Sequence, residues 1–258
     1  MSTEKIDPSC ESCAFHNVAQ LKKLGVNVEN SDFVVALAGN PNTGKSTVFN
    51  ALTGLRQHTG NWAGKTVTRA EGGFIYNDKR FKLIDLPGTY SLLSTSEDEE
   101  VARNFILFGR PDVTIIVVDA SRLERNLNLV LQVLEITNKA VLCLNLMDEA
   151  ERHGIKIDER TLAKKLGIPV VATSARTNKG IPELISVVNQ VATNEIICKP
   201  HRIQNLPKHL SAAVNKLSKG ISEAYPEIPN SRWLAMRLLD GDKSVQEALK
   251  SGEFLNSI

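Results

Sequence analysis

Hydrophobic residues along this chain gather in short runs, separated by longer segments in which apolar positions recur every three or four residues. The short runs predict buried strands, and the segments between them predict amphipathic helices. Strands are expected at 33–38, 67–76, 81–84, 113–118, 140–144 and 169–172, and helices at 44–53, 123–136, 159–166 and 181–191. Apolar strands that alternate with covering helices are typical of a doubly wound α/β sheet, so residues 32–195 are predicted to form an α/β domain.

The two ends of the chain follow other patterns. Residues 1–31 are mostly polar and are expected to form an N-terminal extension. From residue 196 onward prolines separate segments of helical spacing and no strand-like run remains, so residues 196–258 are expected to form a small all-helical domain. Within the α/β region, Asn77 and Asp78 separate two strand runs and predict a hairpin without the usual glycine.

Composition limits the classes of function. The 258 residues are 42% hydrophobic and 23% charged, and 31 basic against 29 acidic residues leave a net charge of +2. This balance lacks the basic footprint of a nucleic-acid binder, so no nucleic-acid partner is expected. The apolar runs are too short to cross a bilayer and no secretory signal opens the chain, which favours a cytoplasmic location with reduced cysteines.

A glycine-rich loop carries the first chemical signal. The segment 39–46 fits the motif G-x-x-x-x-G-K-[ST] and lies between a predicted strand and a predicted helix, as a phosphate-binding loop requires. Its N–H groups would hold the phosphates of a nucleotide, Lys45 would reach the β- and γ-phosphates, and the Ser46 hydroxyl would bind Mg²⁺. The residues expected to contact the nucleotide here are Gly39, Asn40, Pro41, Asn42, Thr43, Gly44, Lys45, Ser46 and Thr47.

Two later motifs complete a GTPase pattern. Asp85-Leu-Pro-Gly88 ends an apolar strand, so Asp85 would face Mg²⁺ directly or through a water, and the Gly88 N–H would face the γ-phosphate. Asn145-Leu-Met-Asp148 fits N-x-x-D, in which the carboxylate accepts two hydrogen bonds that only guanine can donate. The guanine-binding residues are expected to be Asn145, Met147, Asp148, Ser174 and Ala175. Leu146 replaces the lysine of the more familiar N-K-x-D form, which suggests weaker nucleotide binding and faster release.

The segments around these motifs resemble a known family. Gly54-Leu-Arg-Gln-His-Thr-Gly-Asn-Trp-Ala-Gly-Lys-Thr-Val67 and Asp85-Leu-Pro-Gly-Thr-Tyr-Ser-Leu92 are similar to the switch I and switch II signatures of the ferrous-iron transport protein B family. The resemblance implies a GTPase that serves a membrane domain carrying Fe²⁺ in the bacterial inner membrane. This chain would be its cytosolic part. Whether a second copy of the chain also binds it, forming an oligomer, stays open. By matching position Thr66 would close on Mg²⁺ and the γ-phosphate, so the expected catalytic residues are Lys45, Thr66 and Gly88, and the expected Mg²⁺ residues are Ser46, Thr66 and Asp85.

Potassium is a further expectation, because no glutamine follows Gly88 to position water. In GTPases with asparagine at the fourth position of the phosphate-binding loop, a bound K⁺ can occupy the place of an arginine finger. Asn42 stands at that position, and the family resemblance makes the carbonyls of Gly60 and Trp62 its expected co-ligands. The alternative is that Asn42 is a turn residue that only braces the loop.

Other features have competing interpretations. Cys10, Cys13 and His16 could hold Zn²⁺ or Fe²⁺ as three ligands of an incomplete site, or could belong to a mobile tail. The acidic run 97–100 could bind iron, but the segment Ser96-x-x-Glu99 fits a helix capping box better. As alternatives to a transport GTPase, the chain could be a ribosome-assembly GTPase, which the absence of a basic stripe argues against, or a nucleotide sensor without functional hydrolysis.

Overall fold

The structure is a computed structural model, which describes residues 21–22, 24–26, 28, 31–54, 57–93, 96–202, 206–226 and 230–250. Its centre is a seven-stranded sheet in the order β2-β3-β4-β1-β5-β6-β7, in which β4, β1, β5, β6 and β7 are parallel and the β2–β3–β4 end is antiparallel. The strands are β1 Phe33–Gly39, β2 Gln57–Asn61, β3 Thr68–Tyr76, β4 Lys79–Asp85, β5 Val113–Asp119, β6 Ala140–Asn145 and β7 Val170–Ala172. The helices around the sheet are α2 Lys45–Thr53, α3 Glu97–Phe108, α4 Leu123–Ile136, α5 Met147–Arg152, α6 Glu159–Leu166 and α7 Ile181–Ala192, with short 3₁₀ turns at Ala120–Arg122 and Ala175–Thr177.

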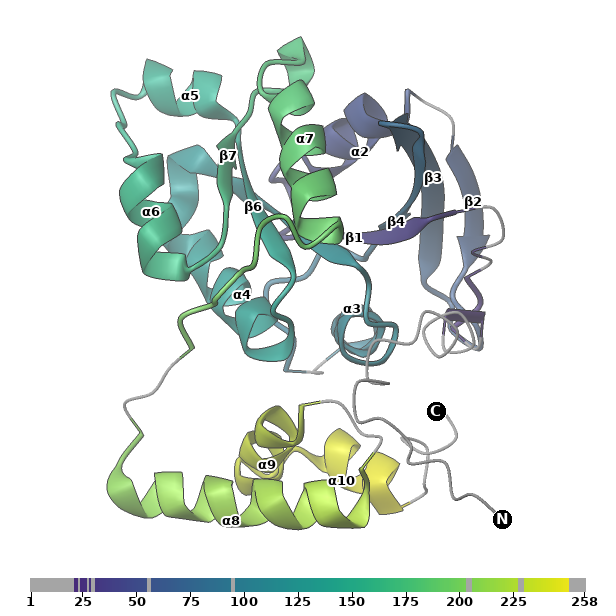
Figure 1. Cartoon of the computed structure of the whole chain (residues 1–258), viewed down its shortest axis with the longest axis vertical. Coiled ribbons are helices and arrows are strands. Elements are labelled where there is room, and N and C mark those ends of the chain that lie inside the picture. The colour runs from purple at the N-terminus through teal and green to yellow at the C-terminus, as the bar shows by residue number, and fades with distance from the viewer. Residues whose placement is uncertain are drawn as a thin grey trace, which may run out of the picture.

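Helices cover both faces of the sheet, as a doubly wound fold requires (Figure 1). Alternate residues of β1 face opposite sides: Val35 and Leu37 pack with α2 and α7, whereas Val34 and Ala36 belong to the cluster formed with α3 and α4. Because the central strands are buried on both faces, they read in sequence as continuous apolar runs. The predicted α/β fold is confirmed.

The predicted hairpin between β3 and β4 is also confirmed. Asn77 and Asp78 have φ values of 49° and 60°, the left-handed conformation that both central residues of a type I′ turn require. Asparagine and aspartate tolerate it better than other residues with a side chain, which explains how the turn forms without glycine. The strand β2 was not predicted, because its sequence is polar and has no alternation.

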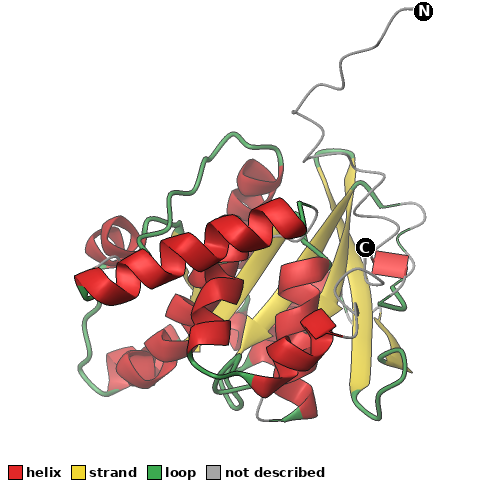
Figure 2. Ribbon diagram, turned by 90° about the horizontal axis from the view of Figure 1, so that it is seen from below, coloured by secondary structure: helices red, strands yellow, loops and turns green. Residues whose placement is uncertain are grey.

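The C-terminal part is helical, as predicted, and consists of α8 Lys208–Ala224, α9 Ser231–Leu239 and α10 Lys243–Lys250 (Figure 2). Val214 of α8 and Trp233 of α9 belong to the same hydrophobic cluster as α3 and α4, so the helical domain shares a core with the sheet domain. No helix within the described ranges is long and apolar enough to cross a membrane. The boundaries at residues 32 and 196 stay predictions.

Polar contacts fix the helical domain to the C-terminal end of α4. Asn230 Nδ2 donates to the carbonyls of Glu135 and Ile136 at 2.6 and 3.1 Å, and Arg202 Nε donates to the carbonyl of Leu134 at 3.0 Å. The last carbonyls of a helix have no partner within the helix, so these side chains satisfy groups that would otherwise need water. The helical domain therefore lies at the edge of the sheet where β6 begins.

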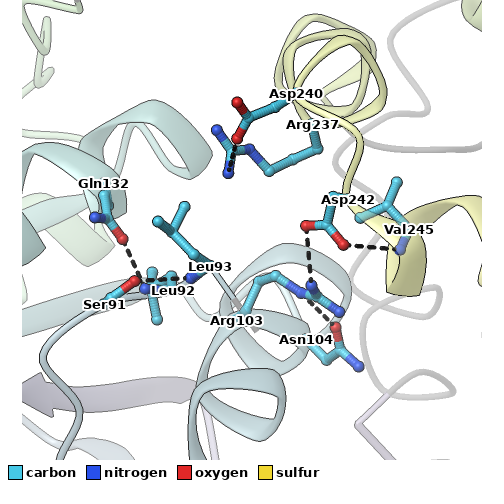
Figure 3. Close-up of polar contacts among 10 residues, drawn as sticks. All are labelled: Ser91, Leu92, Leu93, Arg103, Asn104, Gln132, Arg237, Asp240, Asp242 and Val245. Atoms are coloured by element: carbon cyan, nitrogen blue, oxygen red, sulfur yellow. Dashed lines mark hydrogen bonds and ion pairs between the residues drawn. The ribbon is translucent and has the colours of Figure 1, made fainter. Parts of the chain in front are cut away.

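A second polar contact joins α3 to the loop before α10 (Figure 3). Arg103, only 3% exposed, lies with its Nη1 4.0 Å from Asp242 Oδ2, and its guanidinium lies 6.0 Å from the ring centroid of Trp233. The other oxygen of Asp242 accepts the Val245 N–H at 3.2 Å and so caps α10. The Asp242 carboxylate thus caps the N-terminus of α10 and also pairs with Arg103 of the sheet domain.

Candidate nucleotide-binding site

The phosphate-binding loop connects β1 to α2, as its motif predicts. Gly44 precedes α2 with a φ of +78°, and a Cβ atom there would lie 2.4 Å from Asn145 Nδ2. Only glycine combines this backbone conformation with so close an approach. The loop therefore presents its N–H groups and the first turn of α2 toward the edge where the parallel strands end, which is a favourable place for an anion.

Lys45 and Asp85 meet beside this loop. The Lys45 ammonium contacts the Asp85 carboxylate in a short ion pair and also donates to the Leu86 carbonyl at 2.7 Å. Burial raises the pKa of Asp85 above its ordinary value, and the charge of Lys45 acts in the opposite direction. An anionic, partly buried carboxylate held by one cation is a suitable position for a divalent cation, so Asp85 and the exposed Ser46 hydroxyl fit Mg²⁺ by their donor chemistry.

Asn145 connects the phosphate-binding loop to the loop after β7. It is completely buried, its Nδ2 donates to the Thr43 carbonyl at 3.0 Å, and its Oδ1 accepts the Ala175 N–H at 3.1 Å. The sequence predicted Asn145 among the guanine-binding residues. In the structure its amide is used by two protein loops, so it positions the site rather than facing an open space.

Two residues that were not predicted as site residues support Asn145. Thr173 Oγ1 donates to Asn145 Oδ1 at 3.2 Å, and the Cys143 thiol lies 3.2 Å from the same Thr173 hydroxyl. Since the Thr173 proton is used toward Asn145, the thiol must be the donor in the second contact. Burial raises the pKa of Cys143 to about 12, which keeps the thiol protonated as this role needs. The apolar run around Cys143 gave no signal of this contact.

The residues predicted to bind guanine lie at the ends of β6 and β7. Leu146 has a φ of 61°, and its Cδ2 would lie 3.7 Å from a Cβ at Gly44, so its side chain sits beside the phosphate-binding loop. The Asp148 N–H donates to Ser174 Oγ at 3.2 Å, which joins the two loops. The Asp148 carboxylate is 43% exposed and lies 3.5 Å from Arg152, so it is accessible to a base.

Residues 62–66 of the switch I segment pack on α3 in this structure. Trp62 is 4% exposed and its ring contacts that of Phe105 edge-on at 5.3 Å, while Lys65 pairs with Glu100 at 3.0 Å. The Thr66 hydroxyl donates to Glu97 at 3.1 Å. The predicted Mg²⁺ ligand Thr66 is therefore engaged with α3, and switch I would have to move for Thr66 to join Ser46 and Asp85.

The predicted potassium residues are in different surroundings. Asn42 is exposed and has a φ of 65°. Asparagine tolerates this left-handed conformation, so the backbone of the loop alone can explain why asparagine stands at this position. Gly60 lies in β2, opposite Arg69 of β3, and the Trp62 carbonyl accepts the Lys65 N–H at 3.1 Å. The structure does not bring these three residues together.

The switch II segment is held by α4 and ends at a helix cap. The Leu92 N–H donates to Gln132 Oε1 at 2.6 Å (Figure 3), and near Gly88 the Thr89 N–H donates to the Gly39 carbonyl at 3.2 Å. Ser96 Oγ accepts the Glu99 N–H at 3.3 Å, which confirms the predicted cap of α3.

The predicted N-terminal metal residues, Cys10, Cys13 and His16, lie outside the described residues. Among the residues that are described, no group of three or more His, Cys, Asp or Glu side chains could hold a metal ion.

Comparison with known proteins gives consistent matches. The family model described as "Ferrous iron transport protein B" matches residues 33–188, and the FeoB cytosolic helical domain model matches residues 207–258. The Fe(2+) transporter FeoB of Shigella flexneri is 43% identical over 212 residues, which are 81% of this chain and 27% of that protein. The chain thus spans about a quarter of the length of such curated relatives.

Solved structures agree in fold. The cytosolic domain of the T. maritima FeoB iron transporter in a GDP form has a TM-score of 0.77 at 38% identity, covering 87% of this chain and 85% of that one. The cytosolic domain of L. pneumophila FeoB has a TM-score of 0.76 at 35% identity, with 87% and 88% covered.

Proposed function

Because this chain belongs to the ferrous iron transport protein B family, as its P-loop GTPase domain followed by a helical domain, we propose that it hydrolyses GTP in a Mg²⁺-dependent and K⁺-stimulated reaction and regulates Fe²⁺ passage through a membrane domain. The observation that carries the proposal is that the phosphate-binding loop meets Asp85 through Lys45 and meets the N-x-x-D loop through the hydrogen bond of Asn145 to Thr43. GDP-bound and GMPPNP-bound forms of the T. maritima relative support guanine-nucleotide binding.

The roles of the residues follow from their positions. The N–H groups of the phosphate-binding loop bind the phosphates, and Asp148 accepts hydrogen bonds from guanine. Lys45 leaves Asp85 for the phosphates, since it can neutralise either anion. Ser46 and Asp85 would hold Mg²⁺, which when bound supplies charge neutralisation on the phosphates. Thr66 exchanges Glu97 for this site when switch I closes, and the Gly88 N–H orients the γ-phosphate.

Potassium stimulation rests on Asn42 and on the lack of a glutamine after Gly88. Charge that develops between the β- and γ-phosphates needs a cation, and the amide oxygen of Asn42 can hold one there. Closing switch I would bring the Gly60 and Trp62 carbonyls to the same ion. Such closure would detach Gly60 from Arg69, so stimulation by K⁺ should accompany loss of the β2–β3 pairing.

The test is GTP turnover with Mg²⁺ in K⁺, Na⁺ and Li⁺ at matched ionic strength. Asn42→Gly is the informative variant, because glycine keeps the positive φ and removes only the amide, whereas Asn42→Ala also strains the backbone. We expect turnover to be highest in K⁺ and Asn42→Gly to abolish the difference between salts. Equal rates in all three salts would remove the K⁺ role, and GTP binding without turnover in any salt would favour a nucleotide sensor.

A further inference from the structure

Helix α8 carries a basic face that the nucleotide site does not use. Lys208, His209, Lys216 and Lys219 are all exposed. At 3.6 residues per turn they fall within an arc of about 100° around the helix axis. The opposite side of the helix buries Val214 against the rest of the molecule, so the basic arc points outward.

The segment leading into α8 and most of α8 itself lack acidic residues. Residues 199–222 contain no aspartate or glutamate, although the whole chain has 29 acidic and 31 basic residues. The one acid on α8 is Glu223, which is exposed in the same arc as the lysines and lies 3.8 Å from Lys219. The acids of the following helices, Asp240, Asp242 and Glu247, line a cavity of about 520 Å³ together with the basic residues Arg237 and Lys243 and with Leu93 of the sheet domain. On the outward face of α8, three lysines therefore stand against one acid.

The basic face lies at the opposite end of the molecule from the nucleotide site. The helical domain is bound to the C-terminal end of α4, at the edge where β6 begins, while the phosphate-binding loop follows the end of β1. In Figure 1 α8 lies below the sheet domain, with α9 and α10 between them, and in the view from below α8 is the outermost helix (Figure 2). A surface bound to α8 would leave the nucleotide site open.

We propose that the outward face of α8 docks on an anionic phospholipid surface. The inference rests on the proposed function, in which this chain adjoins a membrane domain, and it adds the surface that meets the bilayer. Each lysine near an anionic leaflet strengthens binding about five-fold, equivalent to ~1 kcal/mol. Such a contact is weak alone, but attachment to a membrane domain would raise the local lipid concentration and make it sufficient to orient the chain.

The experiment measures binding of the purified chain to vesicles of phosphatidylcholine with and without phosphatidylglycerol, at low and high salt. The test variant carries Lys208→Glu, Lys216→Glu and Lys219→Glu. The matched control carries Lys156→Glu, Lys164→Glu and Lys165→Glu, which produce the same net charge from lysines that are also exposed but lie on the sheet domain. Thermal melting verifies that both variants are folded.

We expect the native chain to bind phosphatidylglycerol vesicles, and this binding should weaken as salt is added. The α8 variant should bind about 100-fold more weakly, from three factors of about five, and the control variant should bind as the native chain does. Equal losses in both variants would mean that net charge alone decides, and absence of binding by the native chain would refute the proposal. Tighter binding of duplex DNA than of vesicles through the same lysines would assign the face to nucleic acid. GTP turnover without vesicles, measured in parallel, tests the proposed function separately.

Discussion

Replacing Asn145 by alanine tests whether one buried amide holds the two halves of the nucleotide site together. The change removes three hydrogen bonds: to the Thr43 carbonyl at 3.0 Å, from Thr173 at 3.2 Å and from the Ala175 N–H at 3.1 Å. At about 1 kcal/mol for each neutral bond, the free energy of unfolding should fall by ~3 kcal/mol. A domain of ordinary stability remains folded after such a loss, so binding can be measured.

The functional effect should appear in nucleotide release. Without the bond between Asn145 and Thr43, the phosphate-binding loop and the guanine loop can move apart, and GDP dissociation should accelerate about five-fold, the equivalent of one lost hydrogen bond of about 1 kcal/mol. Urea unfolding followed by tryptophan fluorescence gives the stability, and stopped-flow release of a fluorescent GDP analogue gives the rate.

The matched control is Asn189→Ala on α7. Asn189 is also buried, at 5% exposed, but its Oδ1 has no hydrogen-bond partner among the described residues. The control should lose less stability and release GDP at the native rate. If Asn145→Ala releases GDP no faster than this control, Asn145 does not couple the two loops.

Four further predictions follow from other contacts. Thr173→Val, which keeps the shape but loses the hydroxyl, should destabilise the chain by about 1–2 kcal/mol in urea unfolding, and Thr173→Ser should restore most of this. Asp148→Asn should weaken GTP binding by on the order of 2–4 kcal/mol and favour xanthosine triphosphate in a competition assay, and unchanged GTP affinity would mean that the base lies elsewhere. Arg103→Met leaves the Asp242 carboxylate without its ion pair across the domain boundary, so the C-terminal helices should become more sensitive to protease than in an Arg103→Lys variant. Burial raises the pKa of Asp112 above its ordinary value of 3.8, so the folded state binds its proton more tightly and stability should fall as pH rises through the raised pKa; in Asp112→Asn this part of the pH dependence of urea unfolding should disappear.

The sequence by itself determined the features whose causes are local. The alternation of apolar runs and helical segments predicted the parallel sheet, because buried strands and amphipathic helices leave periodic patterns. The phosphate-binding loop, the Asn77-Asp78 turn and the Ser96 cap were likewise predicted, since each depends on residue types within a few positions of one another.

Only the tertiary structure decided the contacts between distant segments. The strand β2 exists because β3 offers it an edge to pair with, and its own polar sequence carries no strand pattern. The partners of Asn145 lie 102 residues before it and 30 after it, and Cys143 contacts a hydroxyl 30 residues away. The packing of Trp62 on Phe105 and the joining of Arg103 to Asp242 also depend on how elements meet after folding. Such pairs have no fixed spacing along the chain, so no local sequence pattern predicts them. They come together only through the way in which the helices and strands pack.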